Sequence, residues 1–120
     1  MVTERENSML RIAATLLVVL ASLTGCSSAP SAAGDASLDV TIRGSQITPN
    51  AERIPLGVGK TFTLNVDTDR EATIHVHSTP EQEYNVAPGT TPLKIVIDKP
   101  GTVQIEEHQN DIVIATLEVQ

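Results

Sequence analysis

The sequence predicts an all-β domain, and three observations carry this prediction. After residue 37, apolar residues alternate with polar ones and do not recur at the spacing of a helix. β-branched residues dominate these alternating runs, as they do in strands. Turn-forming residues separate the runs at intervals of roughly 8 to 12 residues, which is typical of a sandwich or barrel.

Each alternating run predicts one half-buried strand. Successive side chains of a strand point to opposite sides, so the apolar residues of a run share one face. The residues expected to face the core on successive strands are Leu38, Val40 and Ile42, then Phe62, Leu64 and Val66, then Ile74 and Val76, then Leu93, Ile95 and Ile97, then Val103 and Ile105, and finally Val113, Ala115, Leu117 and Val119. Their span is long enough for one small domain and too short for two.

Turn signals lie between these strands, and two longer segments remain. The turn signals are Gly57-Val58-Gly59, the run 67–70, Pro88-Gly89 and Pro100-Gly101. Segments 45–54 and 78–86 contain or border prolines. We therefore interpret these two segments as connections or edge strands, and as candidate functional loops.

The N-terminal part of the chain has the organisation of an exported, lipid-anchored protein. Residues 12–23 form an apolar stretch behind Arg11, and the stretch is shorter than the roughly 20 residues of a membrane-spanning helix. It ends in Leu23-Thr24-Gly25-Cys26, which resembles the lipobox of bacterial lipoproteins.

This resemblance divides the chain into three segments. It implies that residues 1–25 are a signal peptide and that Cys26 is lipidated, becomes the first mature residue and anchors the protein to a membrane on the extracytoplasmic face of the cell envelope. Residues 26–37 are small and polar, as expected of a flexible tether, and the folded domain is predicted to span 38–120. A start at Met9 would give the signal peptide a positive N-terminus, and the sequence leaves that alternative open.

Charge and composition exclude one class of partner. From Cys26 onward the chain holds six Lys and Arg against thirteen Asp and Glu, a net charge of −7. The aromatic residues are Phe62 and Tyr84 alone, so the chain offers neither a basic stripe nor a stacking platform for bases. We therefore expect no nucleic-acid partner. Because Cys26 is the one cysteine, the predicted domain holds no disulfide, and packing must stabilise it.

Short glycine, proline and histidine motifs follow one another along the predicted domain. They are Gly44 with Ile47-Thr48-Pro49, then the run 54–60 leading into the strand 62–66, then His75-Val76-His77, then Pro88-Gly89, and then Pro100-Gly101 and His108. This order resembles that of cupredoxin-like domains, which include small bacterial envelope cupredoxins and the cupredoxin modules of iron-uptake proteins. The resemblance implies a Greek-key β-sandwich of seven to eight strands with a metal site, where one is present, at one end.

The predicted domain lacks two ligand types that the blue-copper members of that family use. Those members bind copper through two histidines, a thiolate and usually an axial methionine. Here Cys26 lies in the lipobox, and both methionines lie in the signal peptide. At the end of the penultimate strand, where the family's cysteine would stand, this chain has Glu106-Glu107-His108. Composition therefore excludes blue-copper electron transfer.

The candidate metal ligands are the three histidines of the chain, His75, His77 and His108. Residues i and i+2 of a strand point to the same face, so His75 and His77 emerge together and could share one Cu(II) or Zn(II) ion, with copper preferred. If the last hairpin lies beside this strand, as the resemblance implies, His108 would add a third nitrogen, and Glu106 or water would be a fourth ligand. The alternatives are that the histidines only occupy a solvated strand face, or that they give a weak pH response.

The sequence shows no enzymatic motif. It contains no nucleophile elbow, no phosphate-binding glycine loop and no dinucleotide fingerprint, so we predict that the protein is not an enzyme. Two carboxylate pairs, Glu81 with Glu83 and Glu106 with Glu107, are interpreted as solvated surface.

Two functions stay open. One is a membrane-anchored cupredoxin-like lipoprotein that binds copper or zinc through imidazoles at the cell envelope. The other is a metal-free cupredoxin-like module that has a structural role or contacts another envelope protein. Convergence of the three histidines in the folded domain would favour the first function, and their separation would favour the second.

Overall fold

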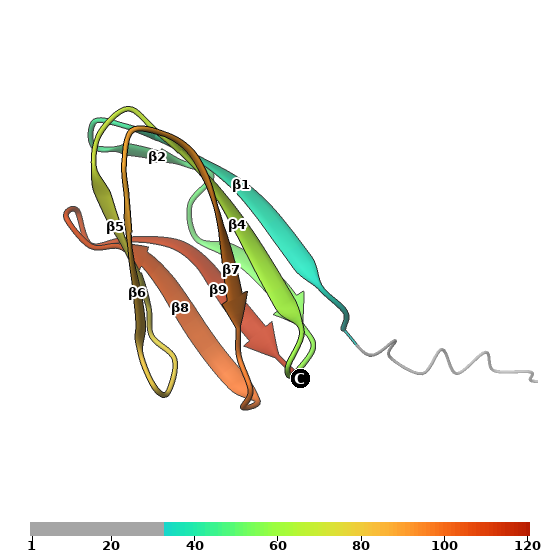
Figure 1. The fold of residues 1–120 in the computed structure, drawn as a ribbon. Helices are drawn as coiled ribbons and strands as arrows, with labels where there is room; N and C mark the ends of the chain where they lie inside the picture. The colour runs from blue at the N-terminus through green and yellow to red at the C-terminus, as the bar shows by residue number, and fades with distance from the viewer. Residues whose placement is uncertain (1–32) are drawn as a thin grey trace, which may run out of the picture.

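The described part of the chain, residues 33–120 of a computed structural model, is built from strands alone (Figure 1). Within these residues the strands are β1 (Ala36–Arg43), β2 (Gln46–Thr48), β3 (Glu52–Leu56), β4 (Thr61–Thr68), β5 (Ala72–Val76), β6 (Gln82–Val86), β7 (Gly89–Val96), β8 (Gly101–Glu107) and β9 (Ile112–Val119). Across the same residues, no helix is long and apolar enough to cross a membrane. The predicted signal peptide, Cys26 and most of the predicted tether lie outside the described residues.

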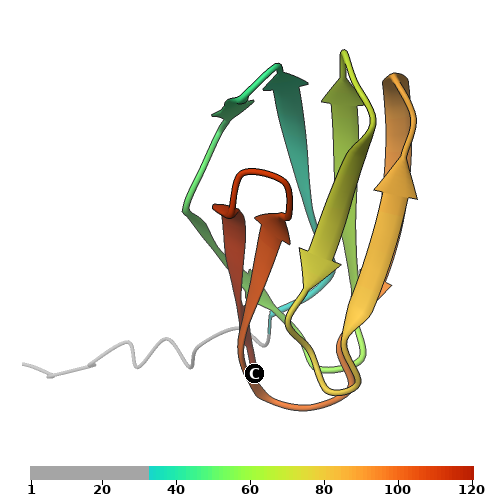
Figure 2. The ribbon, with the colours of Figure 1, turned by 90° about the vertical axis from the view of Figure 1, so that its left-hand side faces the viewer.

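The strands form two sheets that face each other as a sandwich (Figures 1 and 2). One sheet has the order β2-β1-β4-β7 and the other the order β3-β9-β8-β5-β6. The pairs β1 with β4 and β3 with β9 are parallel, and the other pairs are antiparallel. The prediction of an all-β sandwich is confirmed. The described residues hold nine strands instead of seven or eight, because segments 45–54 and 78–86 contribute short strands at the sheet edges.

Side chains from the inner faces of both sheets form one apolar core. The predicted alternation places Phe62, Ile74 and Ile95 in this core, each with an exposed fraction of 0%. Burying one such side chain stabilises the fold by roughly 1.5–3 kcal/mol. β1 begins at Ala36, two residues before the predicted start of the domain, because Ala36 and Ser37 already pair with β4 and Ala36 packs against the core.

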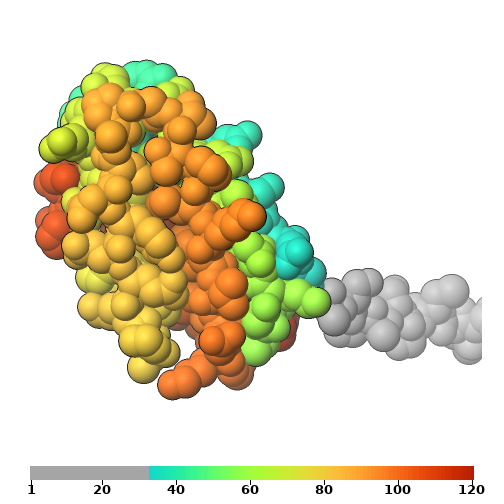
Figure 3. Space-filling model, viewed as in Figure 1, coloured from blue at the N-terminus to red at the C-terminus, as the bar shows by residue number. Residues whose placement is uncertain are grey.

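The edge strands β6 and β7 lie side by side and close one flank of the sandwich (Figure 3). The two strands belong to different sheets. The side-chain amide of Gln82 on β6 donates a hydrogen bond to the carbonyl of Val96 on β7 at 3.3 Å. This hydrogen bond links β6, the edge strand next to β5, to β7 in the other sheet.

Strand β9 departs from the predicted alternation. We expected Val113 to face the core, but Val113 is only partly buried, and Ile114 has an exposed fraction of 0%. In the ladder with β8, Ile105 pairs with Ala115. The next pair joins Glu106 to Val113, so Ile114 has no partner and forms a β-bulge. The prediction for Val113 was wrong because it assumed strict alternation along the strand. The unpaired residue of the bulge shifts the alternation by one position, so Ile114 is buried in place of Val113.

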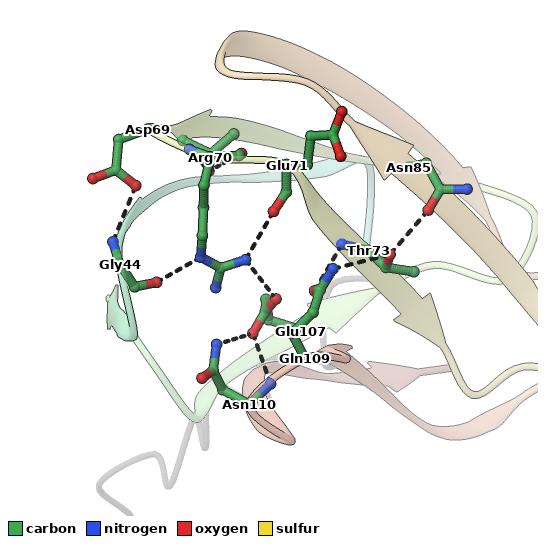
Figure 4. A network of polar contacts seen from close by, with 10 residues as sticks. Gly44, Asp69, Arg70, Glu71, Thr73, Asn85, Glu107, Gln109 and Asn110 are labelled. Carbon is green, nitrogen blue, oxygen red and sulfur yellow. Dashed lines mark hydrogen bonds and ion pairs between the residues drawn. The ribbon is translucent and has the colours of Figure 1, made fainter.

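A buried ion pair lies at the end of the sandwich where β5 begins (Figure 4). Glu107 is the last residue of β8, its side chain has an exposed fraction of 0%, and its Oε1 lies 3.1 Å from Nη1 of Arg70. Asn110, in the following turn, donates to the other carboxylate oxygen from its backbone N–H at 3.1 Å and from its side-chain amide at 2.6 Å. Both oxygens of Glu107 therefore accept hydrogen bonds.

The guanidinium of Arg70 ties the two sheets together. Its Nε donates to the carbonyl of Gly44 at 2.7 Å, and Gly44 lies between β1 and β2 of the first sheet. Glu107 belongs to the second sheet. The interpretation of Glu107 as solvated surface was wrong, because the alternation of β8 turns its side chain inward beside Ile105 and Arg70 supplies the opposite charge.

The electrostatics of this ion pair link stability to pH. Burial of Glu107 acts to raise its pKa, but hydrogen bonds from Arg70 and Asn110 and the positive charge of Arg70 outweigh burial. The pKa of Glu107 in the folded protein is therefore below its ordinary value of 4.5. On acidification the Glu107 carboxylate is therefore protonated in the unfolded chain at a higher pH than in the folded protein. The contribution of Glu107 to the free energy of unfolding is fully present above about pH 4.5 and is lost as the pH falls through the folded-state pKa.

Replacing the charge of this ion pair tests the linkage. At about pH 7, we expect Glu107→Gln to lower the free energy of unfolding by about 1–3 kcal/mol, because Arg70 loses its counter-charge but keeps some access to solvent. The difference from the wild type should shrink below about pH 4.5. Urea unfolding at a series of pH values measures both effects, with the exposed Glu83→Gln as a control that should change stability by less than about 0.5 kcal/mol. A difference that is independent of pH would contradict the assignment.

Candidate functional site

Strand β5 and the residue after it carry two histidines on the outer face of the second sheet. Ile74 and Val76 point into the core with exposed fractions of 0%, so His75 and His77 point outward together, as predicted. The N–H of His77 donates to the carbonyl of Gln104 at 2.9 Å, which extends the pairing with β8 by one residue. The two imidazole rings lie side by side, with centroids 4.3 Å apart and planes tilted by 43°.

The turn between β5 and β6 brings a carboxylate against both rings. The buried hydroxyl of Ser78 donates to a backbone carbonyl within the turn at 2.6 Å and accepts from the amide of Gln82 at 3.1 Å. Glu81 then lies with Oε2 3.1 Å from Nε2 of His75 and with Oε1 4.0 Å from Nδ1 of His77. One nitrogen of each ring and one oxygen of Glu81 all lie within 4.8 Å of one another.

A second carboxylate approaches from β8. Oε2 of Glu106 lies 2.9 Å from Nε2 of His77. The other ring nitrogen of His77, Nδ1, is the one nearer Glu81. Glu106 is also the β8 partner of His75 in the ladder, and Glu83 is the β6 partner of His75 on the other side. The pair of histidines is therefore flanked by carboxylates from both neighbouring strands.

The third predicted ligand, His108, lies at the margin of this cluster. Its N–H donates to the carbonyl of Thr73 at 2.9 Å, which holds the start of the β8–β9 turn against β5. The ring centroid of His108 lies 6.0 Å from that of His75, and the two rings meet edge to face at 82°. His108 does not belong to the three residues whose ligand atoms gather within 4.8 Å. The structure thus brings His75 and His77 together with Glu81 and places His108 beside them.

The members of the cluster differ in their access to solvent. The exposed fraction of the side chain is 19% for His75, 22% for Glu106, 37% for His77 and 65% for Glu81. The rings are thus partly buried on a paired strand, whereas the Glu81 carboxylate lies in the turn and is open to water. Imidazole nitrogens with a carboxylate oxygen are ligands that suit Zn(II) and Cu(II).

Glu81 is the site residue that sequence reasoning assigned to the solvated surface. The structure shows why it reaches the histidines. The hairpin register pairs Val76 with Gln82, so the next positions, His77 and Glu81, come opposite each other in the turn. The sequence feature that could have indicated this contact is the four-residue spacing between His77 and Glu81 across a turn that contains a proline. This spacing predicts the contact only once the hairpin register is known.

A buried glutamate stands at the end of β8, where the cupredoxin resemblance implies a cysteine. The last residue there is Glu107, and its two oxygens are engaged by Arg70 and Asn110. Residues 33–120 also contain no cysteine and no methionine.

No protein-family model matches the chain, and no curated protein sequence matches it. Solved structures do match it. A methionine-to-alanine mutant of amicyanin, in its Cu(I) form, is 11% identical over 70% of this chain and 82% of its own, with a TM-score of 0.53. A multicopper oxidase from Pediococcus acidilactici is 14% identical over 70% of this chain and 26% of its own, with a TM-score of 0.52.

A further multicopper oxidase, one that functions in iron import, is 12% identical with a TM-score of 0.53. The match covers 72% of this chain and 23% of that oxidase, so this chain corresponds to about a quarter of either oxidase. Identities at this level show the fold and nothing finer. With the two sheets described above, these likenesses show that residues 33–120 form a cupredoxin-like β-sandwich.

Proposed function

We propose that the protein is a lipid-anchored, cupredoxin-like protein of the cell envelope that binds Cu(II) or Zn(II) through His75, His77 and Glu81. The observation that carries this proposal is the gathering of two ring nitrogens and a carboxylate oxygen within 4.8 Å on one hairpin. The protein acts as a metal-binding module for storage, sensing or delivery, without catalysis and without electron transfer at a thiolate centre.

The distances within the cluster support a metal site. Zinc lies about 2.0–2.1 Å from imidazole nitrogens and carboxylate oxygens, so tetrahedral coordination separates neighbouring ligand atoms by about 3.3 Å. The two distances from Glu81 oxygens to the rings, 3.1 and 4.0 Å, lie on either side of that value. The three ligand atoms lie within 4.8 Å of one another, so side-chain rotations would have to bring them closer together to bind one ion. Water would complete the coordination.

His108 is not a ligand in this proposal. Its ring lies 6.0 Å from that of His75, centroid to centroid, and would have to move before it could bind the same ion. The proposed site therefore consists of His75, His77 and Glu81 and leaves His108 out, because the three residues converge without it.

The envelope location rests on the N-terminal segment. The lipobox-like sequence ending at Cys26 follows an apolar stretch and precedes a small, polar tether. A metal-binding domain anchored in this way would face the extracytoplasmic space, where it could meet ions and other envelope proteins. The alternative function is a metal-free module that contacts such a protein, and the metal titration below distinguishes the two.

Calorimetric titration of Cu(II) and Zn(II) into residues 27–120 tests the metal site. We expect one ion per chain, no binding by the His75→Ala, His77→Ala double variant, and binding weakened at least tenfold by Glu81→Ala, a loss of about 1.4 kcal/mol or more, because one of three ligands is removed. His108→Ala is the matched control, since it removes an imidazole beside the site, and its affinity should stay within about threefold of the wild type.

Three other outcomes of that titration would contradict the proposal or change its ligands. If neither metal binds the wild type, the metal-free alternative replaces the proposal. If His108→Ala abolishes binding while Glu81→Ala does not, the three ligands are the three histidines. If the double variant binds as tightly as the wild type, the ion lies elsewhere.

Replacing Cys26 tests the anchor. Cys26→Ala, expressed from the full chain, should move the protein from the membrane fraction to the soluble fraction. The physical reason is that each buried methylene of an acyl chain contributes about 0.8 kcal/mol of membrane affinity, and the variant has no acyl chain. Immunoblots of the two fractions measure the change, with Ser27→Ala as a control that keeps the thiol. A variant that still sediments with membranes would refute lipid anchoring at this residue.

A further inference from the structure

We infer that Glu106 is a positioning residue that holds His77 with its proton on Nε2, so that the lone pair of His77 lies on Nδ1, the nitrogen nearer Glu81. This inference rests on the proposed metal site and deepens it. It also gives Glu106 a role different from the one the sequence suggested, which was that of a fourth ligand.

The two nitrogens of His77 have different neighbours. Nε2 lies 2.9 Å from Oε2 of Glu106, whereas Nδ1 is the nitrogen nearer Glu81, at 4.0 Å from its Oε1. An ionised carboxylate has no proton to donate, so the hydrogen bond to Glu106 requires the proton on Nε2. In a neutral imidazole the other nitrogen then carries the lone pair. The lone pair of Nδ1 is thus on the ring nitrogen that lies nearer Glu81.

Glu106 is held more firmly than Glu81. It lies in β8, pairs with His75 across the ladder and leaves 22% of its side chain exposed, against 65% for Glu81. The β-bulge at Ile114 lies directly opposite, where the register between β8 and β9 shifts. A partly buried carboxylate on a paired strand is suited to fix the orientation of a neighbouring ring.

The geometry argues against Glu106 as a ligand of the same ion. Its oxygens are not among the atoms that gather within 4.8 Å, and they lie on the Nε2 side of His77. Histidines that bind a metal through one nitrogen commonly donate the other N–H to a carboxylate, which fixes the ring and its tautomer. His77 already has this arrangement. His75, in contrast, directs Nε2 at Glu81 and must give up any proton there when a metal binds.

Two measurements on residues 27–120 test the inference. The first is the tautomer of His77, read from imidazole ¹⁵N shifts of the metal-free protein at about pH 8, where an ordinary histidine is neutral. The second is the affinity for Zn(II), measured by calorimetry. The variants are Glu106→Ala and Glu106→Gln. The control is Glu83→Ala, because Glu83 flanks His75 from β6 as Glu106 does from β8, and no hydrogen bond joins it to a histidine within residues 33–120.

We expect the Nε2–H tautomer of His77 in the wild type and in Glu106→Gln, whose amide oxygen still accepts the hydrogen bond. Glu106→Ala should show a mixture of both tautomers. Its Zn(II) affinity should fall about 10- to 100-fold, the usual effect of removing the hydrogen-bond partner of a metal ligand. Glu106→Gln should lose less. Glu83→Ala, which removes the same charge, should change the affinity by less than about threefold because exposed charges are screened.

The opposite outcomes overturn the inference. An Nδ1–H tautomer in the wild type would do so, as would equal losses of affinity in Glu83→Ala and Glu106→Ala, which would leave Glu106 acting through charge alone. A Glu106→Gln variant as weak as Glu106→Ala would mark Glu106 as a direct ligand. If the wild type binds no Zn(II) but His77 keeps an Nε2–H tautomer that depends on Glu106, the proposed metal function fails and the orienting contact stands.

Discussion

The candidate site depends on β5 being hydrogen-bonded on both sides, to β6 and to β8. This double pairing fixes the direction of every side chain of the strand, so the burial of Ile74 and Val76 places His75 and His77 together on the outer face. A shift of register by one residue would exchange the faces and bury both imidazoles without partners, which is costly. Packing of the core therefore holds the two proposed ligands side by side without help from a metal.

The ion pair of Arg70 and Glu107 secures the same strand at its beginning. Arg70 lies two residues before β5, and its guanidinium reaches the end of β8 and the β1–β2 turn. Both oxygens of Glu107 accept hydrogen bonds, and its side chain is fully buried. The place where the cupredoxin resemblance implies a thiolate thus has a structural use in this protein. The proposed metal chemistry lies instead on the outer face of the second sheet.

The fold could be predicted from the sequence because buried and exposed side chains alternate along a half-buried strand. This alternation can be recognised in a single strand, without knowing which strands it pairs with. The errors arose where the outcome depends on pairing between distant segments. Ile114 replaces Val113 in the core because of a bulge against β8. Glu107 is buried because Arg70, 37 residues away in the chain, neutralises it. Glu81 joins the histidines because of the hairpin register, and no periodic pattern reports that register.

The proposed ligands differ in how firmly they are held, and this difference determines how an ion would enter and leave. His75 lies on β5 and His77 directly after it, in contact with Glu106, whereas Glu81 lies in a turn with 65% of its side chain exposed. All three donors come from one hairpin, so a bound ion would keep one side open to water. Withdrawal of Glu81 alone would leave the ion on two imidazoles, with free positions for the ligands of another protein. An open site of this kind suits the transfer of an ion between proteins, because the acceptor can bind the ion before the hairpin releases it.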